Sequence, residues 1–170
     1  MIRPVLKYGS KELVTVSSPV SVYDEDLQEL VRDMTDTMYA ESGIGLAAPQ
    51  VGVNLRVIVV DVEGPDGNRD ALKLINPQIL SSEGREKGEE GCLSIPGFTA
   101  IVERPQKIKV QAEDTEGGSV ELDAEGMLAR VICHEVDHLD GILYLDRLSL
   151  LRRDVIKRKI KKLIKSGDWV

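Results

Sequence analysis

The sequence predicts an α+β fold in one domain, with mixed or antiparallel β-sheets wrapped around a central helix. Two patterns favour this class. The middle of the chain holds several short β-branched segments separated by turn residues, which is typical of strands in a sheet. Three other segments carry apolar residues at helical spacing, one near each end and one between them. A chain of 170 residues can bury one core of normal size, so we expect a single domain over residues 1–170.

The amino-terminal part predicts an irregular segment followed by a packing helix. Residues 1–23 contain two prolines and a glycine, which interrupt regular structure. From Asp24 onward, apolar residues recur at helical spacing as far as Met38. Acidic residues at the start favour the amino end of a helix, and Gly43 provides a stop.

The strands are expected between this first helix and residue 122. Residues 43–52 are rich in small residues and predict a tight connection into the first strand. Polar residues at 63–70 predict a turn, and the charged stretch 81–90 predicts a loop. The strands are expected at residues 55–62, 72–75, 78–80, 99–102, 107–113 and 119–122.

The second helix, predicted over about residues 123–139, contains the only two histidines of the chain. His134 and His138 are four residues apart, which places them on one face of a helix. Two imidazoles so placed can bind one metal ion, and Glu135 between them can carry a proton for a metal-bound water. The motif alone also fits a surface helix whose histidines have no function.

A third metal ligand is expected from upstream in the sequence. Met127 and Val131 precede the histidines at helical spacing, so the pair lies on an apolar face, where two unpartnered imidazoles would be unfavourable. A catalytic metal typically has three protein ligands and one open position. No His or Glu follows the second histidine. Cys92, in a turn-rich segment, is the better candidate, because Cys133 points about 100° away from the first histidine.

Three stretches together resemble the peptide deformylase family. They are GIGLAAPQ at residues 43–50, EGCLS at 90–94 and HEVDHLDG at 134–141. Their order and separation are specific, and the similarity covers nearly the whole chain, including a carboxyl-terminal helix like that of the compact bacterial type. The family removes the formyl group from the amino-terminal formylmethionine of new polypeptides. The resemblance implies a hydrolase that releases formate, with Cys92, His134 and His138 as ligands of one divalent metal ion.

The resemblance also implies the metal and the catalytic roles. Iron(II) is the usual ion in the family, and zinc, nickel or cobalt can take its place, as thiolate and imidazole ligands allow. Glu135 would transfer the proton from water to the leaving amine. The Gln50 side-chain amide and the Leu93 backbone N–H would stabilise the negative charge that develops on the formyl oxygen.

Substrate-binding positions are expected on both sides of this site. The peptide backbone is expected to pair like an added strand with residues 44–45 and 90–91. The methionine side chain needs an apolar pocket. A formyl carbon carries only hydrogen, so a tight site with several glycines can admit it and exclude larger acyl groups. The expected residues are Ile44, Gly45, Glu90, Gly91, Met127 and Val131.

The charge of the chain is unevenly distributed. Residues 147–165 hold nine Lys or Arg and one acid, which gives this segment a charge of +8. The rest of the chain has a charge of −15, and the two add to the net charge of −7. This segment predicts an amphipathic helix over about residues 149–165. Its apolar residues are expected to pack, namely Leu151, Val155, Ile156, Ile160, Leu163 and Ile164. The basic face suggests an anionic partner, for which ribosomal RNA is a hypothesis, although a solvated covering helix explains the same pattern.

The sequence also limits the alternatives. No apolar run exceeds four residues, so we expect no membrane span, no signal peptide and a cytoplasmic location, without a membrane or DNA partner. One alternative is an HExxH metallopeptidase, which would cut internal peptide bonds. Another is a non-catalytic binding module stapled by a metal. The latter is less favoured, because structural zinc normally has four protein ligands.

Overall fold

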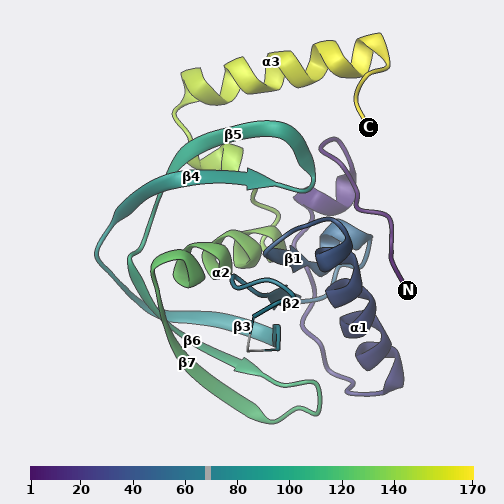
Figure 1. Ribbon diagram of the computed structural model, residues 1–170, viewed down its shortest axis with the longest axis vertical. Coiled ribbons are helices and arrows are strands. Elements are labelled where there is room, and N and C mark those ends of the chain that lie inside the picture. The colour runs from purple at the N-terminus through teal and green to yellow at the C-terminus, as the bar shows by residue number, and fades with distance from the viewer. Residues whose placement is uncertain (68–69) are drawn as a thin grey trace.

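The computed structural model describes residues 1–67 and 70–170 (Figure 1). The predicted turn at residues 63–70 therefore lies partly outside the described residues. The α-helices are α1 (Glu25–Ala40), α2 (Gly126–Leu139) and α3 (Leu150–Ser166), with short 3-10 helices at Lys11–Val14, Ala48–Val51 and Tyr144–Arg147. The strands are β1 (Gly45–Ala47), β2 (Val57–Val60), β3 (Leu72–Glu83), β4 (Glu86–Cys92), β5 (Ile95–Arg104), β6 (Lys107–Glu113) and β7 (Ser119–Glu125).

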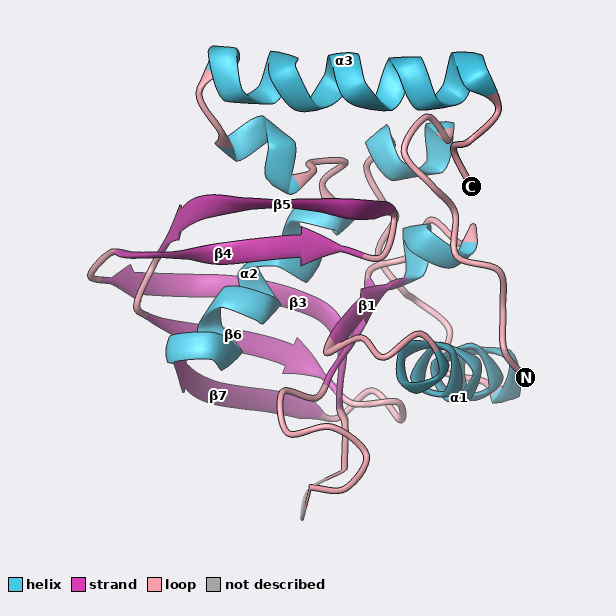
Figure 2. Cartoon of the chain, turned by 45° about the horizontal axis from the view of Figure 1, so that its top comes forward, coloured by secondary structure: helices cyan, strands magenta, loops and turns pink. Residues whose placement is uncertain are grey.

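Two antiparallel sheets enclose helix α2. Within the described residues, one sheet has the strand order β1-β2-β3-β6-β7, and β4 pairs with β5 in a separate two-stranded sheet. Figure 2 shows α2 between the two sheets, α1 beside β1, and α3 beyond β5. The predicted α+β fold, with antiparallel sheets around a central helix, is confirmed.

The core forms because strand β2 is apolar on both faces. Its four residues, Val-Ile-Val-Val, are all buried. Successive side chains of a strand point to opposite faces, so Ile58 and Val60 pack in a cluster with α2, while Val57 and Val59 pack in a cluster with α1. Helix α2 is itself buried from Ala129 to Leu139. The metal-site motif is therefore held by packing on several sides.

The first helix begins and ends close to its predicted bounds. The Asp24 side chain accepts a hydrogen bond from the Leu27 N–H and so satisfies one unpaired donor of the first turn. Leu27, Leu30, Val31, Met34 and Met38 are buried against the sheet, as the spacing predicted. The helix fixes the start of the segment that leads to β1.

The predicted loop at residues 81–90 is wrong. Strand β3 continues to Glu83, and β4 begins at Glu86 and pairs with β5 from Glu86↔Arg104 to Cys92↔Ile95. Strand β3 also continues through Asn76-Pro77, where the register with β6 shifts. The Asn76 side chain accepts from the Val20 N–H and donates to the Val20 carbonyl, which stabilises this irregularity.

Two further boundaries differ from the prediction. The second helix begins at Gly126 instead of about residue 123, because residues 119–125 form β7 and pair with β6 as far as Lys107↔Glu125. Strand β2 is shorter than the predicted 55–62. Pairing partners far away in the sequence set both boundaries.

Helix α3 matches its predicted range, but only half of the six apolar residues predicted to pack do so, namely Ile156, Ile160 and Leu163. Ile160 is fully buried, whereas Leu151 is 77%, Val155 45% and Ile164 50% exposed. The helix lies beyond β5 (Figure 2), and its Ile156 and Ile160 belong to a hydrophobic cluster with residues of the body. Within residues 1–67 and 70–170, no helix combines the length and apolar character needed to cross a bilayer.

Gly141, just after α2, is expected to be essential for stability. Its φ is +72°, and a Cβ there would lie 2.9 Å from the backbone carbonyl carbon and oxygen of Val14. Replacement by Ala is expected to lower the free energy of unfolding by more than about 2 kcal/mol, because backbone strain and a clash with main chain add together. Urea denaturation at fixed metal loading measures this loss.

Gly167 provides the matched control. Its φ is +81°, but nothing lies within 4 Å of the added Cβ. Gly167→Ala is expected to cost about 1 kcal/mol, the strain alone. Equal losses in the two variants would contradict the role of the Val14 contact.

Candidate metal centre

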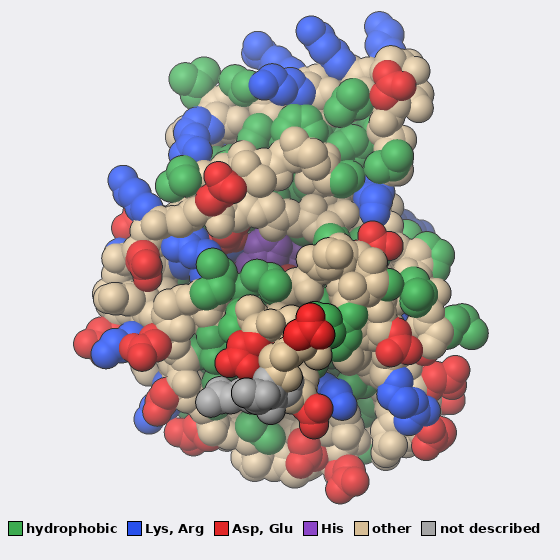
Figure 3. Space-filling view, in the orientation of Figure 1, with side chains coloured by type: hydrophobic (Ala, Val, Ile, Leu, Met, Phe, Trp, Pro, Cys, Tyr) green, Lys and Arg blue, Asp and Glu red, His purple; other side chains and the backbone are tan. Residues whose placement is uncertain are grey.

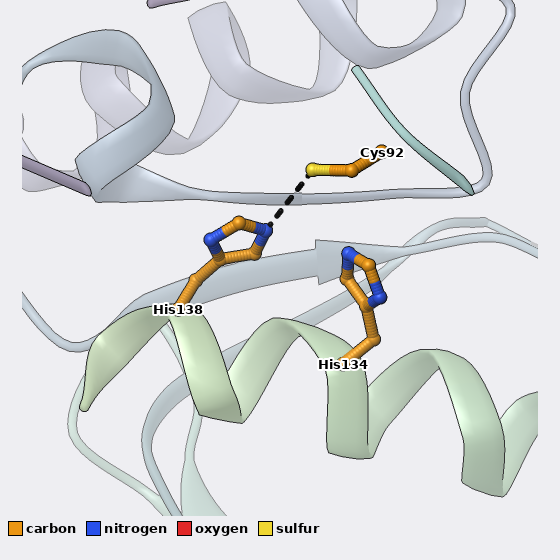
Figure 4. A group of neighbouring side chains, drawn as sticks. All are labelled: Cys92, His134 and His138. Atoms are coloured by element: carbon orange, nitrogen blue, oxygen red, sulfur yellow. Dashed lines mark hydrogen bonds between the residues drawn. The ribbon is translucent and has the colours of Figure 1, made fainter. Parts of the chain in front are cut away.

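Strand β4 and helix α2 bring one thiol and two imidazoles together. The Cys92 Sγ lies 3.4 Å from the His138 Nε2, and the ligand atoms of Cys92, His134 and His138 all lie within 4.8 Å of one another. Figure 4 shows the sulfur directed toward both rings, which project from successive turns of α2. Cys92 is the last residue of β4, where the register with β5 shifts after Gly91. This bulge turns its side chain toward the helix.

Cys133 lies outside this group, although it is next to His134 in the sequence. Its side chain is buried, and burial raises the pKa of its thiol to about 11. In the described part of the chain, the group of possible ligands consists of Cys92 and the two histidines.

The Glu90 carboxylate fixes the orientation of the His134 ring. The His134 Nδ1 donates to Glu90 Oε1 at 2.9 Å, which leaves Nε2 as the free ligand atom. Burial alone would raise the pKa of Glu90, but hydrogen bonds from His134 and Arg104 lower it to about 2. The carboxylate is therefore charged at neutral pH. Such a partner on the distal nitrogen sets both the tautomer and the ring plane of a metal ligand.

Sequence reasoning missed the buried ionic network that surrounds Glu90. Arg104 donates to Glu90 through Nε and Nη2, both at 2.9 Å, and to Asp137 through Nη1 at 2.6 Å. Arg130 donates to Glu90 at 2.8 Å, and Arg147 donates to Asp137 at 2.8 and 3.0 Å. One signal was available: residues 130, 134 and 137 share a helix face, and chargeable groups on a buried face require partners.

The two histidines differ in their affinity for protons. Burial lowers the pKa of His134, but the neighbouring Cys92 sulfur and the Glu90 carboxylate raise it to a net value well above normal. Burial, followed by the charge of His134, lowers the pKa of His138 well below normal. Both rings must be deprotonated at the ligating nitrogen to hold a metal ion, so loading of the site would release a proton.

Glu135 is buried beside the group, close to the His134 ring. Its Oε2 lacks a hydrogen-bond partner among the described residues, and its Oε1 lies 4.0 Å from the His134 Nε2. Burial raises the pKa of this carboxyl to about 7. A Cβ at Gly45 would lie 2.9 Å from Glu135 Oε1 and 2.7 Å from Val131 Cγ1, so only glycine fits there. The carboxylate can accept and release a proton near neutral pH.

The Gln50 side chain has a fixed orientation. Its Oε1 accepts from the Ala47 N–H at 2.9 Å, so the amide nitrogen is the end that faces the site. That nitrogen donates to Ser94 Oγ at 3.1 Å and lies 3.6 Å from Cys92 Sγ. Leu93, between Cys92 and Ser94, lines the adjoining cavity.

A cavity of about 450 Å³ opens beside the group, with a strand on either side. Figure 3 shows the histidine atoms in a hollow on this face, bordered by hydrophobic side chains. Met127 is 54% exposed and lies at the rim, whereas Val131 is buried. The side chain of Glu90 is engaged with Arg104, Arg130 and His134. All the predicted substrate-binding residues line the cavity: Ile44, Gly45, Glu90, Gly91, Met127 and Val131.

The family model for polypeptide deformylase matches residues 2–154. The chain belongs to the polypeptide deformylase family. It is 43% identical over 169 residues to a peptide deformylase of Acidobacterium capsulatum, with 99% of each chain covered. It is 50% identical over 166 residues to one of Alkalilimnicola ehrlichii, covering 98% of this chain and 93% of the relative. The crystal structure of a peptide deformylase from Legionella pneumophila superposes with a TM-score of 0.91 at 42% identity, covering 98% of both chains.

The donor set fits the metal that deformylases require. One thiol and two imidazoles form a three-ligand group, which leaves a position open in a four-coordinate site. These ligands suit iron(II), zinc, nickel and cobalt. The distal nitrogen of His134 is already held by Glu90, as metal-bound imidazoles normally require. The group can therefore hold a metal ion.

Proposed function

We propose that this chain hydrolyses the N-formyl group of the formylmethionine at the start of newly made polypeptides and releases formate. The observation that carries the proposal is the unpartnered, buried Glu135 carboxylate beside the Cys92–His134–His138 group, at the base of a cavity between two strand edges. Residues 1–170 would act as one catalytic domain, in the cytoplasm, where such polypeptides are made.

Cys92, His134 and His138 would hold one divalent ion. Iron(II) is the proposed physiological ion, and zinc, nickel or cobalt could occupy the same ligands. When bound, the ion supplies Lewis acidity, which makes water a nucleophile near neutral pH. Glu90 would keep the His134 ring in place throughout, because Arg104 donates two hydrogen bonds to its carboxylate and stabilises its charge.

Glu135 would move the one proton that the reaction has to relocate. As water attacks the formyl carbon, the carboxylate accepts a proton from it. When the bond between the formyl carbon and the methionine nitrogen breaks, the same proton passes to that nitrogen. The products are formate and a peptide with a free amino terminus. A pKa of about 7 suits a group that both accepts and donates during one cycle.

Gln50 and Leu93 would stabilise the formyl oxygen as negative charge develops on it. The Gln50 amide nitrogen is already aimed, because the Ala47 N–H holds the other end of the side chain. A donor fixed before the reaction needs no reorganisation in the transition state. The Leu93 backbone N–H would be the second donor.

The peptide would bind as an additional strand between β1 and β4. Strand β1 is the edge of the five-stranded sheet, so the main chain of Gly45 can pair with the peptide, while the neighbouring Ile44 carbonyl accepts from the Asp61 N–H within the sheet. Glu90 and Gly91 would pair with the peptide from the opposite wall. The methionine side chain would pack near Ile44, Met127 and Val131. The limited space at Gly45 favours a formyl hydrogen over a larger acyl group.

Incubation with formyl-Met-Ala-Ser tests the proposal. We expect one formate for each new amino terminus, with the internal peptide bonds intact. Acetyl-Met-Ala-Ser is the matched control and should resist, since its methyl group needs more room. Cleavage of internal bonds would instead favour the HExxH metallopeptidase, and no cleavage of either kind would favour a non-catalytic module.

The basic face of α3 would contact the ribosome, where the substrate emerges beside anionic RNA. Lysines and arginines line the outer edge of α3 in Figure 3. Reversing the exposed Lys161 and Lys162 to Glu is expected to weaken co-sedimentation with ribosomes, with the largest relative loss at low salt. Turnover of formyl-Met-Ala-Ser should be unchanged, because α3 lies outside the cavity.

A second double reversal provides the control for net charge. Lys107 and Lys109 are similarly exposed, but they lie on β6. Their reversal changes the charge by the same amount and should leave ribosome binding nearly intact. Equal losses from the two pairs would show a nonspecific charge effect and contradict docking through α3.

A further inference from the structure

Arg130 is a buried arginine that connects the metal-bearing helix to the main chain of the two-stranded sheet. It stands one turn before His134 and is 6% exposed. Its Nη2 donates to the Glu86 carbonyl at 2.7 Å, and its Nη1 donates to the Val102 carbonyl at 2.8 Å. The same Nη1 donates to the Glu90 carboxylate at 2.8 Å. One guanidinium thus binds both strands of the two-stranded sheet, called the β4–β5 ribbon below.

Gly88 provides the space in which this guanidinium lies. A Cβ at Gly88 would be 2.9 Å from the Arg130 Cζ and 3.0 Å from both Nε and Nη2. The φ of Gly88 is not positive, so its backbone does not require glycine. Gly88 pairs with Val102 across the ribbon, and Glu86 and Glu90 share its face by the two-residue period of a strand. Arg130 therefore lies flat against the β4–β5 ribbon where a side chain is missing.

This contact matters because β4 forms one wall of the cavity. Residues 89–93 line the cavity from the β4 side, and residues 42–45 line it from the β1 side. Within the described residues, β4 and β5 pair only with each other and share no ladder with the five-stranded sheet. The distance between the walls is therefore set by side-chain contacts together with the main-chain bonds that Leu6 and Tyr8 donate to the Gln50 and Ser94 carbonyls. Arg104 links β5 to Asp137, whereas Arg130 holds the main chain of β4 itself.

We propose that Arg130 is a positioning residue that sets the place of the β4 wall and so the fit of the peptide. The inference rests on the proposed deformylase function and deepens it. Arg130 lines part of the cavity itself and holds the backbone of β4 in place, and Gly88 provides the space that its guanidinium needs. The orientation of the metal ligand His134 does not depend on Arg130. If Arg130 is replaced, Glu90 still accepts two hydrogen bonds from Arg104 and one from His134.

Arg130→Met tests whether Arg130 positions the β4 wall without supporting the metal ligand. We expect the KM for formyl-Met-Ala-Ser to rise about tenfold, from the loss of one to two backbone hydrogen bonds that hold the wall. Both kcat and bound metal should stay within about twofold of wild type. Arg130→Lys should not restore KM, since a single ammonium can reach Glu90 but cannot span the Glu86 and Val102 carbonyls as a planar guanidinium does.

Gly88→Ala disturbs the contact between Arg130 and β4 by a change in β4 instead of in α2. The added methyl displaces the guanidinium while Arg130 and Glu90 remain, so KM should rise here too. In the double variant with Arg130→Met, the methyl has nothing to displace, and the second substitution should add no further increase. Arg152→Met is the matched control. Its guanidinium donates to the Ile101 carbonyl of β5 from the solvent side, and its loss should leave KM unchanged.

Hydrogen exchange of the β4 amides, measured in the same variants, is independent of turnover. We expect faster exchange over residues 86–92 in Arg130→Met and Gly88→Ala, with α2 unchanged. An unchanged KM with loss of metal and kcat would overturn the proposal, and so would additive effects of the two substitutions. A wild-type chain that releases no formate would refute the proposed function, while the exchange data would still decide whether Arg130 anchors β4.

Discussion

Replacing Glu135 by Ala is expected to lower formate release by a factor of about 10²–10⁴, the usual contribution of a positioned general acid–base. The carboxylate is buried, its Oε2 lacks a partner in the described structure, and its pKa is raised to about 7. Alanine has no group that can hold the proton at that place. The three ligand atoms of Cys92, His134 and His138 do not depend on Glu135, so metal content should remain.

Glu135→Gln is the conservative companion of this variant. It keeps the size and polarity of the side chain and removes only the ability to take a proton, so it should be equally inactive. Initial rates with formyl-Met-Ala-Ser and metal analysis of the same samples provide both readouts. A Glu135→Ala protein that works at the wild-type rate would refute the proton-transfer role.

Replacing Cys92 by Ala is expected to reduce both bound metal and formate release by more than about a hundredfold. Loss of an outer-shell partner alone typically reduces metal affinity 10- to 100-fold, and a direct ligand should matter more. The two histidines would remain on α2, but a site with two imidazoles cannot match the three-ligand group.

Cys133→Ala is the matched control, because the two cysteines are the only ones in the chain. Cys133 is buried on the same helix as the histidines but outside the ligand group. Its removal should cost some stability and leave metal content and turnover close to wild type. If the two variants retained equal amounts of metal, Cys92 would not be a ligand.

The sequence could predict the parts of the site that depend on local geometry. His134 and His138 share a face because a helix has 3.6 residues per turn, and this holds wherever the helix packs. The Asp24 cap and the apolar face of α1 are local in the same sense. The lack of a His or Glu after His138 indicated an upstream third ligand, for which Cys92 was the better candidate, and the resemblance to a family added Gln50, Leu93 and the strand-edge residues.

The parts that failed depend on partners distant in the sequence. Residues 81–90 are polar and charged, and most of them become strand because residues 81–83 pair with β6 and residues 86–90 pair with β5. The network around Glu90 joins residues 14 to 44 positions apart, a separation that no local pattern encodes. Helix α3 has an amphipathic sequence, yet only half of the apolar residues predicted to pack do so.

Metal analysis under anaerobic conditions, paired with a formate-release assay on the same protein, tests the central claim most directly. The account predicts one divalent ion per chain. Stripping with a chelator should abolish formate release, and stoichiometric iron(II) should restore it. A stripped protein that still releases formate at its original rate would contradict the account.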